Sequence, residues 1–248
     1  MDIRIKLNPQ YEQLRPYVEH LAQTGELHGE IVHRGRNSLY RLTVEGVDLV
    51  VKSFSHMTVA NRFIYAHFRK IKAVRSYDNA VRIAQLGLLT PDPIASIDVI
   101  QYGNLRRGYY ICRYVDAQKT TRWYERPDGK ELETILATYI YGLRSMGVLH
   151  RDLNPGNILR DRQGNLFLID LNRISFGNTS ESATITNICQ MDHDEEQVRA
   201  LATAYATARG DSKPTDFAKK VVESRARYEH WHFYKRKIKR LLKPWKKR

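Results

Sequence analysis

Three polar side chains in the second half of the sequence are spaced as a phosphoryl-transfer site requires. Residues 150–157 read HRDLNPGN, which places Asp152 five positions before Asn157, and Asp170 follows the hydrophobic run LFLI at 166–169. A carboxylate such as Asp152 can accept the proton of an attacking hydroxyl. The amide oxygen of Asn157 and the carboxylate of Asp170 are hard oxygen ligands that suit Mg²⁺ bound to nucleotide phosphates. The spacing therefore predicts phosphoryl transfer from ATP with Mg²⁺.

A lysine upstream of these residues is a candidate for binding the nucleotide phosphates. Lys52 ends the run VVK on a segment expected to be a strand, where a lysine would pair with the α- and β-phosphates. Such a lysine is usually oriented by an acidic residue on a helix, and Asp78 is the one acid between Ser53 and Thr90. The alternatives are an exposed strand lysine and a surface aspartate that pairs with Arg75 or Arg82.

The segment expected to cover the phosphates is poor in glycine. Residues 33–40 contain one glycine, Gly35, where protein kinases have three. Backbone amides near Ser38 could still bind phosphate, so Gly35 and Ser38 are candidate nucleotide-binding residues. A plain hairpin turn explains the same residues.

These residues must be held by two lobes. Period-two patterns predict strands at 30–33, 39–44, 47–54, 94–100 and 109–115, and residues 57–88 are expected to form one or two helices ending at Gly87. Helices are expected at 132–146, 195–209 and 214–228, and a hairpin of 158–160 with 166–169 returns Asp170 to Asn157. The expected fold is α+β and two-lobed, like a protein kinase. An antiparallel sheet with a helix forms lobe 1–115, with an N-terminal extension to about residue 27, and a mainly helical lobe spans 116–228.

The composition indicates a globular chain with a basic tail. Of the 248 residues 42% are hydrophobic, and neither a transmembrane run nor a secretory signal is apparent. The two cysteines, Cys112 and Cys189, lack metal-ligand spacing and are expected to be reduced thiols. Acidic residues at 192–196 are better explained as a helix start capped near Asp194 than as a metal site.

The net charge of +14 is concentrated at the C-terminus. Residues 225–248 contain eleven Lys or Arg and one acid, a charge of +10, while the other 224 residues carry +4. Apolar side chains in the tail fall on one helical stripe: Trp231, Tyr234, Ile238, Leu241, Leu242 and Trp245. A basic amphipathic helix at 229–248 is therefore expected to bind an anionic membrane surface. The alternatives are a solvated charged segment or a helix that packs on its own lobe.

From residue 29 to the C-terminus the sequence resembles the lipopolysaccharide core kinases, which phosphorylate Kdo or heptose on the inner core of lipid A. The segments that carry the resemblance are VVK at 50–52, RSYDNA at 75–80, TPDPI at 90–94, HRDLNPGNIL at 150–159 and LIDLNR at 168–173. The resemblance implies Asp152 as base, Asn157 and Asp170 as metal ligands and Lys52 as the phosphate lysine. Asp78 stands where a glutamate is expected.

The leading hypothesis is an ATP-dependent sugar kinase that acts on Kdo-lipid A, cytoplasmic and peripheral at the inner face of the inner membrane. Asp170 is followed by LNR instead of Phe-Gly, and no Ala-Pro-Glu follows, so the segment that holds a peptide in protein kinases is missing. An atypical protein kinase is the alternative. A nucleic-acid-binding module that uses the basic tail is less favoured, because no RNA-binding signature is present and no specific nucleic acid is expected.

Overall fold

The computed structural model describes residues 1–35, 37–54 and 71–241, with side chains described as far as Arg227. The chain divides into two compact units. The first comprises Met1–Lys119 and Asn157–Ile174, and the second comprises Thr120–Gly156 and Ser175–Arg248. In the described residues no helix is both long enough and apolar enough to cross a bilayer.

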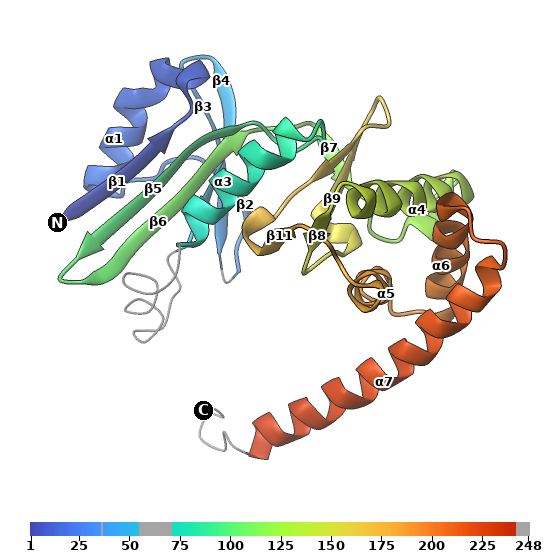
Figure 1. Cartoon of the computed structure of the whole chain (residues 1–248). Coiled ribbons are helices and arrows are strands. Elements are labelled where there is room, and N and C mark those ends of the chain that lie inside the picture. Colours follow the sequence, from blue (N-terminus) through green and yellow to red (C-terminus); the bar gives the residue numbers. More distant parts are fainter. Residues whose placement is uncertain (36, 55–70, 242–248) are drawn as a thin grey trace. The chain divides into compact units, whose positions relative to one another are not determined.

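A six-stranded antiparallel sheet forms the centre of the first unit (Figure 1). Its spatial order is β1 (Asp2–Leu7), β5 (Pro93–Gln101), β6 (Asn104–Arg113), β4 (Val47–Ser53), β3 (Ser38–Val44) and β2 (Glu30–His33). Two hairpins turn through pairs of residues with positive φ, Glu45-Gly46 and Tyr102-Gly103. Such pairs match the twist of the flanking strands, which explains why tight turns close here. The five strands expected from the sequence are present.

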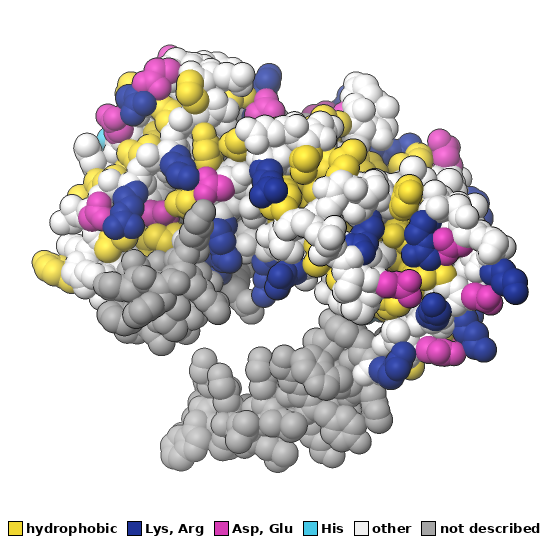
Figure 2. Space-filling view, in the orientation of Figure 1, with side chains coloured by type: hydrophobic (Ala, Val, Ile, Leu, Met, Phe, Trp, Pro, Cys, Tyr) yellow, Lys and Arg dark blue, Asp and Glu magenta, His cyan; other side chains and the backbone are white. Residues whose placement is uncertain are grey.

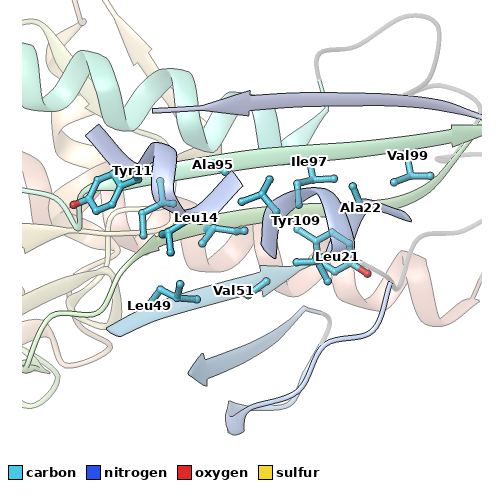
Figure 3. Packing of buried hydrophobic residues seen from close by; sticks show 13 residues of the cluster. Tyr11, Leu14, Leu21, Ala22, Leu49, Val51, Ala95, Ile97, Val99 and Tyr109 are labelled. Carbon is cyan, nitrogen blue, oxygen red and sulfur yellow. The ribbon is translucent and has the colours of Figure 1, made fainter. Parts of the chain in front are cut away.

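One face of this sheet is the apolar core of the first unit. Val51, Ile97 and Tyr109 lie on that face, packed with Leu14 and Leu21 from the N-terminal segments (Figure 3). Those segments are the 3₁₀ helix η1 (Pro9–Leu14) and α1 (Arg15–Thr24), which ends at the left-handed Gly25. Because side chains alternate along a strand, the residues between these apolar ones point to the opposite face.

The N-terminal extension supplies an edge strand. β1 pairs antiparallel with β5, with Asp2 opposite Ile100 and Leu7 opposite Ala95. Its exposure alternates along the strand, and Ile3, Ile5 and Leu7 pack against the apolar core. The sequence predicted packing of this segment but not a sixth strand.

The opposite face of the sheet carries polar side chains and is covered by α3 (Lys72–Gln85), which packs on β5 and β6. Lys52 lies opposite Tyr110, and Tyr110 opposite Ser96, so these residues cross the sheet in one row. The expected helical segment 57–88 lies partly outside the described residues, and its described part ends as predicted before Gly87.

A short three-stranded sheet belongs to the same unit. Its order is β10 (Leu166–Leu168), β9 (Ile158–Asp161) and β7 (Ala117–Lys119), so the predicted hairpin is present. The two compact units differ from the expected lobes, which met at a single boundary after residue 115. Residues 157–174 group with the first unit, because β9 pairs with β7 and the amide of Leu168 donates to the carbonyl of Leu89.

The second unit is mainly helical, as expected. Its helices are η2 (Trp123–Glu125), α4 (Gly129–Ser145), α5 (Glu181–Cys189), α6 (Glu195–Arg209) and α7 (Pro214–Leu241), with β8 (Val148–His150) paired to β11 (Ile174–Phe176). α6 has the predicted bounds, and the Asp194 carboxylate caps it by accepting the amides of Glu196 and Gln197.

α7 is one continuous helix that passes the end expected at Tyr228. The sequence from 215 to 243 contains neither Gly nor Pro, so nothing in it stops the helix. The buried Arg225 fixes its middle, because the guanidinium donates to the carbonyls of Asp192, His193 and Asp194 before α6. The amphipathic face expected at 229–248 lies outside the described side chains.

A carboxyl is buried on the polar face of the main sheet. Asp98 is 1% exposed and its Oδ1 has no hydrogen-bond partner. Burial raises the pKa of Asp98 to about 7, although Arg4 and Lys6 lower it. Because this folded-state pKa exceeds that of the unfolded chain, the protonated carboxyl stabilises the fold at low pH. That stability is lost as the pH rises through about 7.

We therefore predict that Asp98→Asn stabilises the protein above pH 7 and loses this advantage near pH 4. One pKa unit corresponds to about 1.4 kcal/mol, so the gain at pH 8 should be roughly 2–4 kcal/mol. Urea unfolding of both proteins from pH 4 to pH 8 measures it. Exposed Asp2→Asn is the control and should show no such trend. Equal stability of Asp98→Asn and wild type at pH 8 would contradict the prediction.

Candidate active site

Lys52 and Asp170 form an ion pair in the first unit. The Lys52 Nζ lies 2.6 Å from the Asp170 Oδ1, although 118 positions separate the two residues. Both side chains are mostly withdrawn from solvent, with 16% and 31% exposed. β4 supplies the lysine, and the loop after β10 supplies the aspartate. The structure thus brings together two of the residues that the sequence predicted for one site.

A ring and a thiol also lie near Lys52. Its Nζ lies 5.6 Å from the centre of the Phe54 ring. Burial raises the pKa of the neighbouring Cys112 thiol to about 12, and Lys52 only partly opposes this. Neither Cys112 nor Cys189 forms a disulfide, and at neutral pH the Cys112 thiol is protonated and unreactive.

Asp170 adopts a left-handed backbone conformation, with φ 57° and ψ 48°. This region costs an L-residue about 1–2 kcal/mol, although Asp tolerates it better than most. The 3₁₀ helix η4 (Leu171–Arg173) begins directly after it. Asn172 in that helix donates to the Asp170 Oδ1 at 2.6 Å. The carboxylate is thereby directed by two donors, Lys52 and Asn172.

Asn157 is held next to the segment that carries Asp170. It ends the 3₁₀ helix η3 (Pro155–Asn157), and its carbonyl accepts the amide of Ile169 at 3.0 Å. The β9–β10 hairpin creates this contact, since Leu168 lies opposite Ile158. One carboxylate and one side-chain amide oxygen are hard donors, so Asp170 and Asn157 fit the chemistry of Mg²⁺.

The two candidate residues on α3 have separate contacts. Asp78 pairs with Lys6 of β1 at 2.6 Å. Its neighbour Asn79 donates from Nδ2 to the carbonyl of Leu171, also at 2.6 Å. The orienting role expected for Asp78 toward Lys52 stays a prediction, while Asn79, which the sequence did not single out, contacts the Asp170 loop. Its place beside Asp78 in RSYDNA was the available signal.

Asp152 lies in the second unit, in a loop fixed by its own side chains. The amide of Asp152 donates to the His150 Nδ1 at 3.2 Å, and its carbonyl accepts the Asn154 Nδ2 at 3.0 Å. The Asn154 Oδ1 also accepts the amide of Gly156 at 2.9 Å. A Cβ at position 156 would come within 2.9 Å of that oxygen, so a larger residue there would displace the Asn154 side chain. The loop HRDLNPGN is thus stiffened on both sides of Asp152.

Two further residues anchor this loop to the second unit. His150 is 1% exposed, and its carbonyl accepts the Asn187 Nδ2 from α5 at 2.8 Å. Thr120 donates from its amide and its hydroxyl to the Pro155 carbonyl, at 3.2 and 3.1 Å. Neither Asn187 nor Thr120 was predicted from the sequence, because nothing local marks them as partners of a loop far along the chain.

The candidate phosphate loop is the turn between β2 and β3. Gly35 lies within the turn, and Ser38 begins β3 opposite Ser53. A register shift between Ile31 and His33 interrupts the pairing just before this turn. Gly35 and Ser38 therefore belong to the same unit as Lys52 and Asp170, and their binding of phosphate stays a prediction.

Comparison with known proteins supports the kinase interpretation. Residues 106–217 match the model of the phosphotransferase enzyme family APH. A 64-residue stretch is 33% identical to CBL-interacting protein kinase 22 of Oryza sativa subsp. japonica. That match covers 26% of this chain and 14% of the rice protein, so the chain spans a small part of this relative's length.

A solved structure shares the fold. WaaP in complex with acyl carrier protein matches 90% of this chain and 99% of its own, with a TM-score of 0.59 and 14% identity. The Rio2 kinase–ADP/Mg²⁺–phosphoaspartate complex from Chaetomium thermophilum matches 88% and 77%, with a TM-score of 0.49 and 15% identity. The predicted two-lobed, kinase-like α+β fold is confirmed. Residues 106–217 are thus similar to a phosphotransferase family, and the chain shares the fold of WaaP.

Proposed function

We propose that this protein uses ATP to phosphorylate a sugar hydroxyl of the lipopolysaccharide inner core, with Kdo on lipid A as acceptor. The observation that carries the proposal is the Lys52–Asp170 pair, with Asn157 bonded to the adjoining Ile169, within a kinase-like fold. In this proposal Lys52, Gly35 and Ser38 bind the nucleotide phosphates. Asn157 and Asp170 hold Mg²⁺, which neutralises charge on the phosphates.

Asp152 is the proposed base. Its carboxylate accepts the proton of the acceptor hydroxyl while the hydroxyl oxygen bonds to the γ-phosphorus of ATP. The bond from that phosphorus to the bridging oxygen breaks, and ADP leaves with the electron pair. The loop contacts of His150 and Asn154 favour this role, since a base must be held in place before reaction.

A sugar acceptor is preferred to a protein acceptor for a reason in the sequence. Ten residues, 171–180, separate Asp170 from α5; they begin with LNR where a protein kinase has Phe-Gly directly after the aspartate, and they contain no Ala-Pro-Glu. The short match to a rice protein kinase favours protein as the second candidate acceptor. The WaaP structure is a complex with acyl carrier protein, which supports a lipid-related setting for a protein of this fold.

The proposed location is cytoplasmic and peripheral, at the inner face of the inner membrane, through the basic segment 229–248. On the face drawn in Figure 2, acidic side chains lie among the Lys and Arg side chains of the described residues. By residue count, +10 of the net charge of +14 belongs to residues 225–248. Anionic lipid attracts such a segment by about 1 kcal/mol per cation.

We predict that Lys52→Met weakens ATP binding by about 10- to 100-fold. Removing a charged hydrogen-bond donor costs about 1.5–3 kcal/mol, and 1.4 kcal/mol corresponds to a factor of ten. Titration of a fluorescent ATP analogue measures the dissociation constant. Lys219→Met, at an exposed position on α7, is the matched control. Unchanged binding by Lys52→Met would remove Lys52 from the phosphate site.

We predict that wild type adds one phosphate to Kdo-lipid A and that Asp152→Ala binds ATP normally but transfers about 10²- to 10⁴-fold more slowly. Mass spectrometry of the lipid measures the added phosphate. Glu131→Ala, an exposed acid on α4, should behave as wild type. Heptose-containing core and casein are tested in parallel. Transfer to casein alone would overturn the sugar assignment, and full activity of Asp152→Ala would overturn the base.

We predict that the protein binds vesicles containing anionic lipid better than neutral vesicles. Replacing Lys235, Arg236 and Lys237 by Gln should weaken this binding by roughly 100-fold, at about 1 kcal/mol per cation. Vesicle co-sedimentation at fixed salt measures it. A matched control replaces three exposed cations outside the tail: Arg106, Lys213 and Lys219. Tighter binding to duplex RNA than to vesicles would favour the nucleic-acid alternative.

A further inference from the structure

α3 and the loop after it hold the segment that carries Asp170. The amide of Leu168 donates to the Leu89 carbonyl at 2.9 Å, and the Thr90 hydroxyl donates to the Leu168 carbonyl at 2.8 Å. Asn79 donates to the Leu171 carbonyl at 2.6 Å. These bonds lie within the first unit and fix the chain on both sides of Asp170.

The Asn79 contact restrains the chain after Asp170, whereas the Leu89 and Thr90 contacts restrain Leu168 before it. Leu171 directly follows Asp170, so its carbonyl is the first acceptor beyond the left-handed residue. That carbonyl also accepts the amide of Ile174, which closes η4. A left-handed aspartate persists only where its surroundings hold it. Asn79 supplies such a restraint from a different element of the fold.

We infer that Asn79 is a positioning residue, which holds the Asp170 loop in the conformation that binds the metal. The inference rests on the proposed function, because the metal role of Asp170 belongs to that proposal. Asn79 itself acts through the Leu171 backbone and needs no contact with nucleotide. An amide suits this task because its NH₂ donates to a carbonyl, whereas a carboxylate of the same shape does not.

The position of Asn79 is itself fixed from the N-terminal strand. Asp78, the preceding residue on α3, pairs with Lys6 of β1 at 2.6 Å. Two neighbouring side chains on α3 thus link the helix to β1 in one direction and to the Asp170 loop in the other. Lys6 is about half exposed, so its pair should contribute less than the bond from Asn79.

The test compares Asn79→Leu with wild type by binding of a fluorescent ATP analogue, with and without Mg²⁺. Leucine keeps the approximate volume and removes the donor. We expect the Mg²⁺ concentration for half-maximal enhancement of nucleotide binding to rise about 10- to 100-fold, as for other residues that orient metal ligands. Nucleotide affinity without metal should stay within a factor of two of wild type, which distinguishes positioning from general loss of structure.

Three further variants test whether the loss of the Asn79 donor causes the effect. Asn79→Asp should resemble Asn79→Leu, because an ionised carboxylate cannot donate to the Leu171 carbonyl. Gln85→Leu removes an exposed amide from the same helix and should leave the Mg²⁺ midpoint unchanged. Asn79→Ala replaces Asn79→Leu if thermal unfolding shows that leucine does not fit.

Three results would overturn the inference about Asn79. An unchanged Mg²⁺ midpoint in Asn79→Leu overturns the inference alone. A fall in metal-free affinity as large as the shift in the Mg²⁺ midpoint assigns Asn79 a structural role and also overturns it. If wild type binds ATP with no dependence on Mg²⁺, the metal site of the proposed function fails first, and this inference fails with it.

Discussion

The ion pair between Lys52 and Asp170 is the interaction on which the candidate site depends. Its two charges come from the middle of a sheet and from a loop 118 positions later, so the first unit must fold around both. Because both side chains are partly withdrawn from water, either charge would be costly to place there without its partner. Asn172 adds a second donor to the same carboxylate oxygen. The pair can therefore form only when β4 and the loop after β10 have both reached their folded positions.

The two units divide the candidate residues in a chemically sensible way. Residues suited to phosphate and metal lie in the first unit, with the hairpin 157–174 added to the N-terminal sheet. The candidate base Asp152 lies in the second, in a loop held by Asn187 and Thr120. The chain passes from one unit to the other between Gly156 and Asn157. The sequence HRDLNPGN thus contains both the candidate base Asp152 and the crossing point, with Asn157 the first residue after the crossing.

Local patterns predicted much of the fold. The strands around Glu45-Gly46 and the hairpin before Asp170 follow from turn residues between alternating segments, and α6 follows from its cap at Asp194 and its end at Gly210. The features that the sequence did not predict depend on contacts between residues distant in sequence. β1 has a short alternating pattern that only its pairing with β5 makes significant. Likewise, the contacts of Asp78 with Lys6 and of Asn79 with Leu171 need the folded sheet, so the sequence alone could not assign their partners.

The pairing of β1 with β5 has a consequence for biosynthesis. Asp2 lies opposite Ile100, so nearly one hundred residues must be translated before the two strands can meet. Until then Ile3, Ile5 and Leu7 lack their sheet partner, and such an unpaired strand is prone to associate with other chains. A nascent chain that stalls on the ribosome before β5 emerges should accordingly recruit chaperones, and one that stalls later should not.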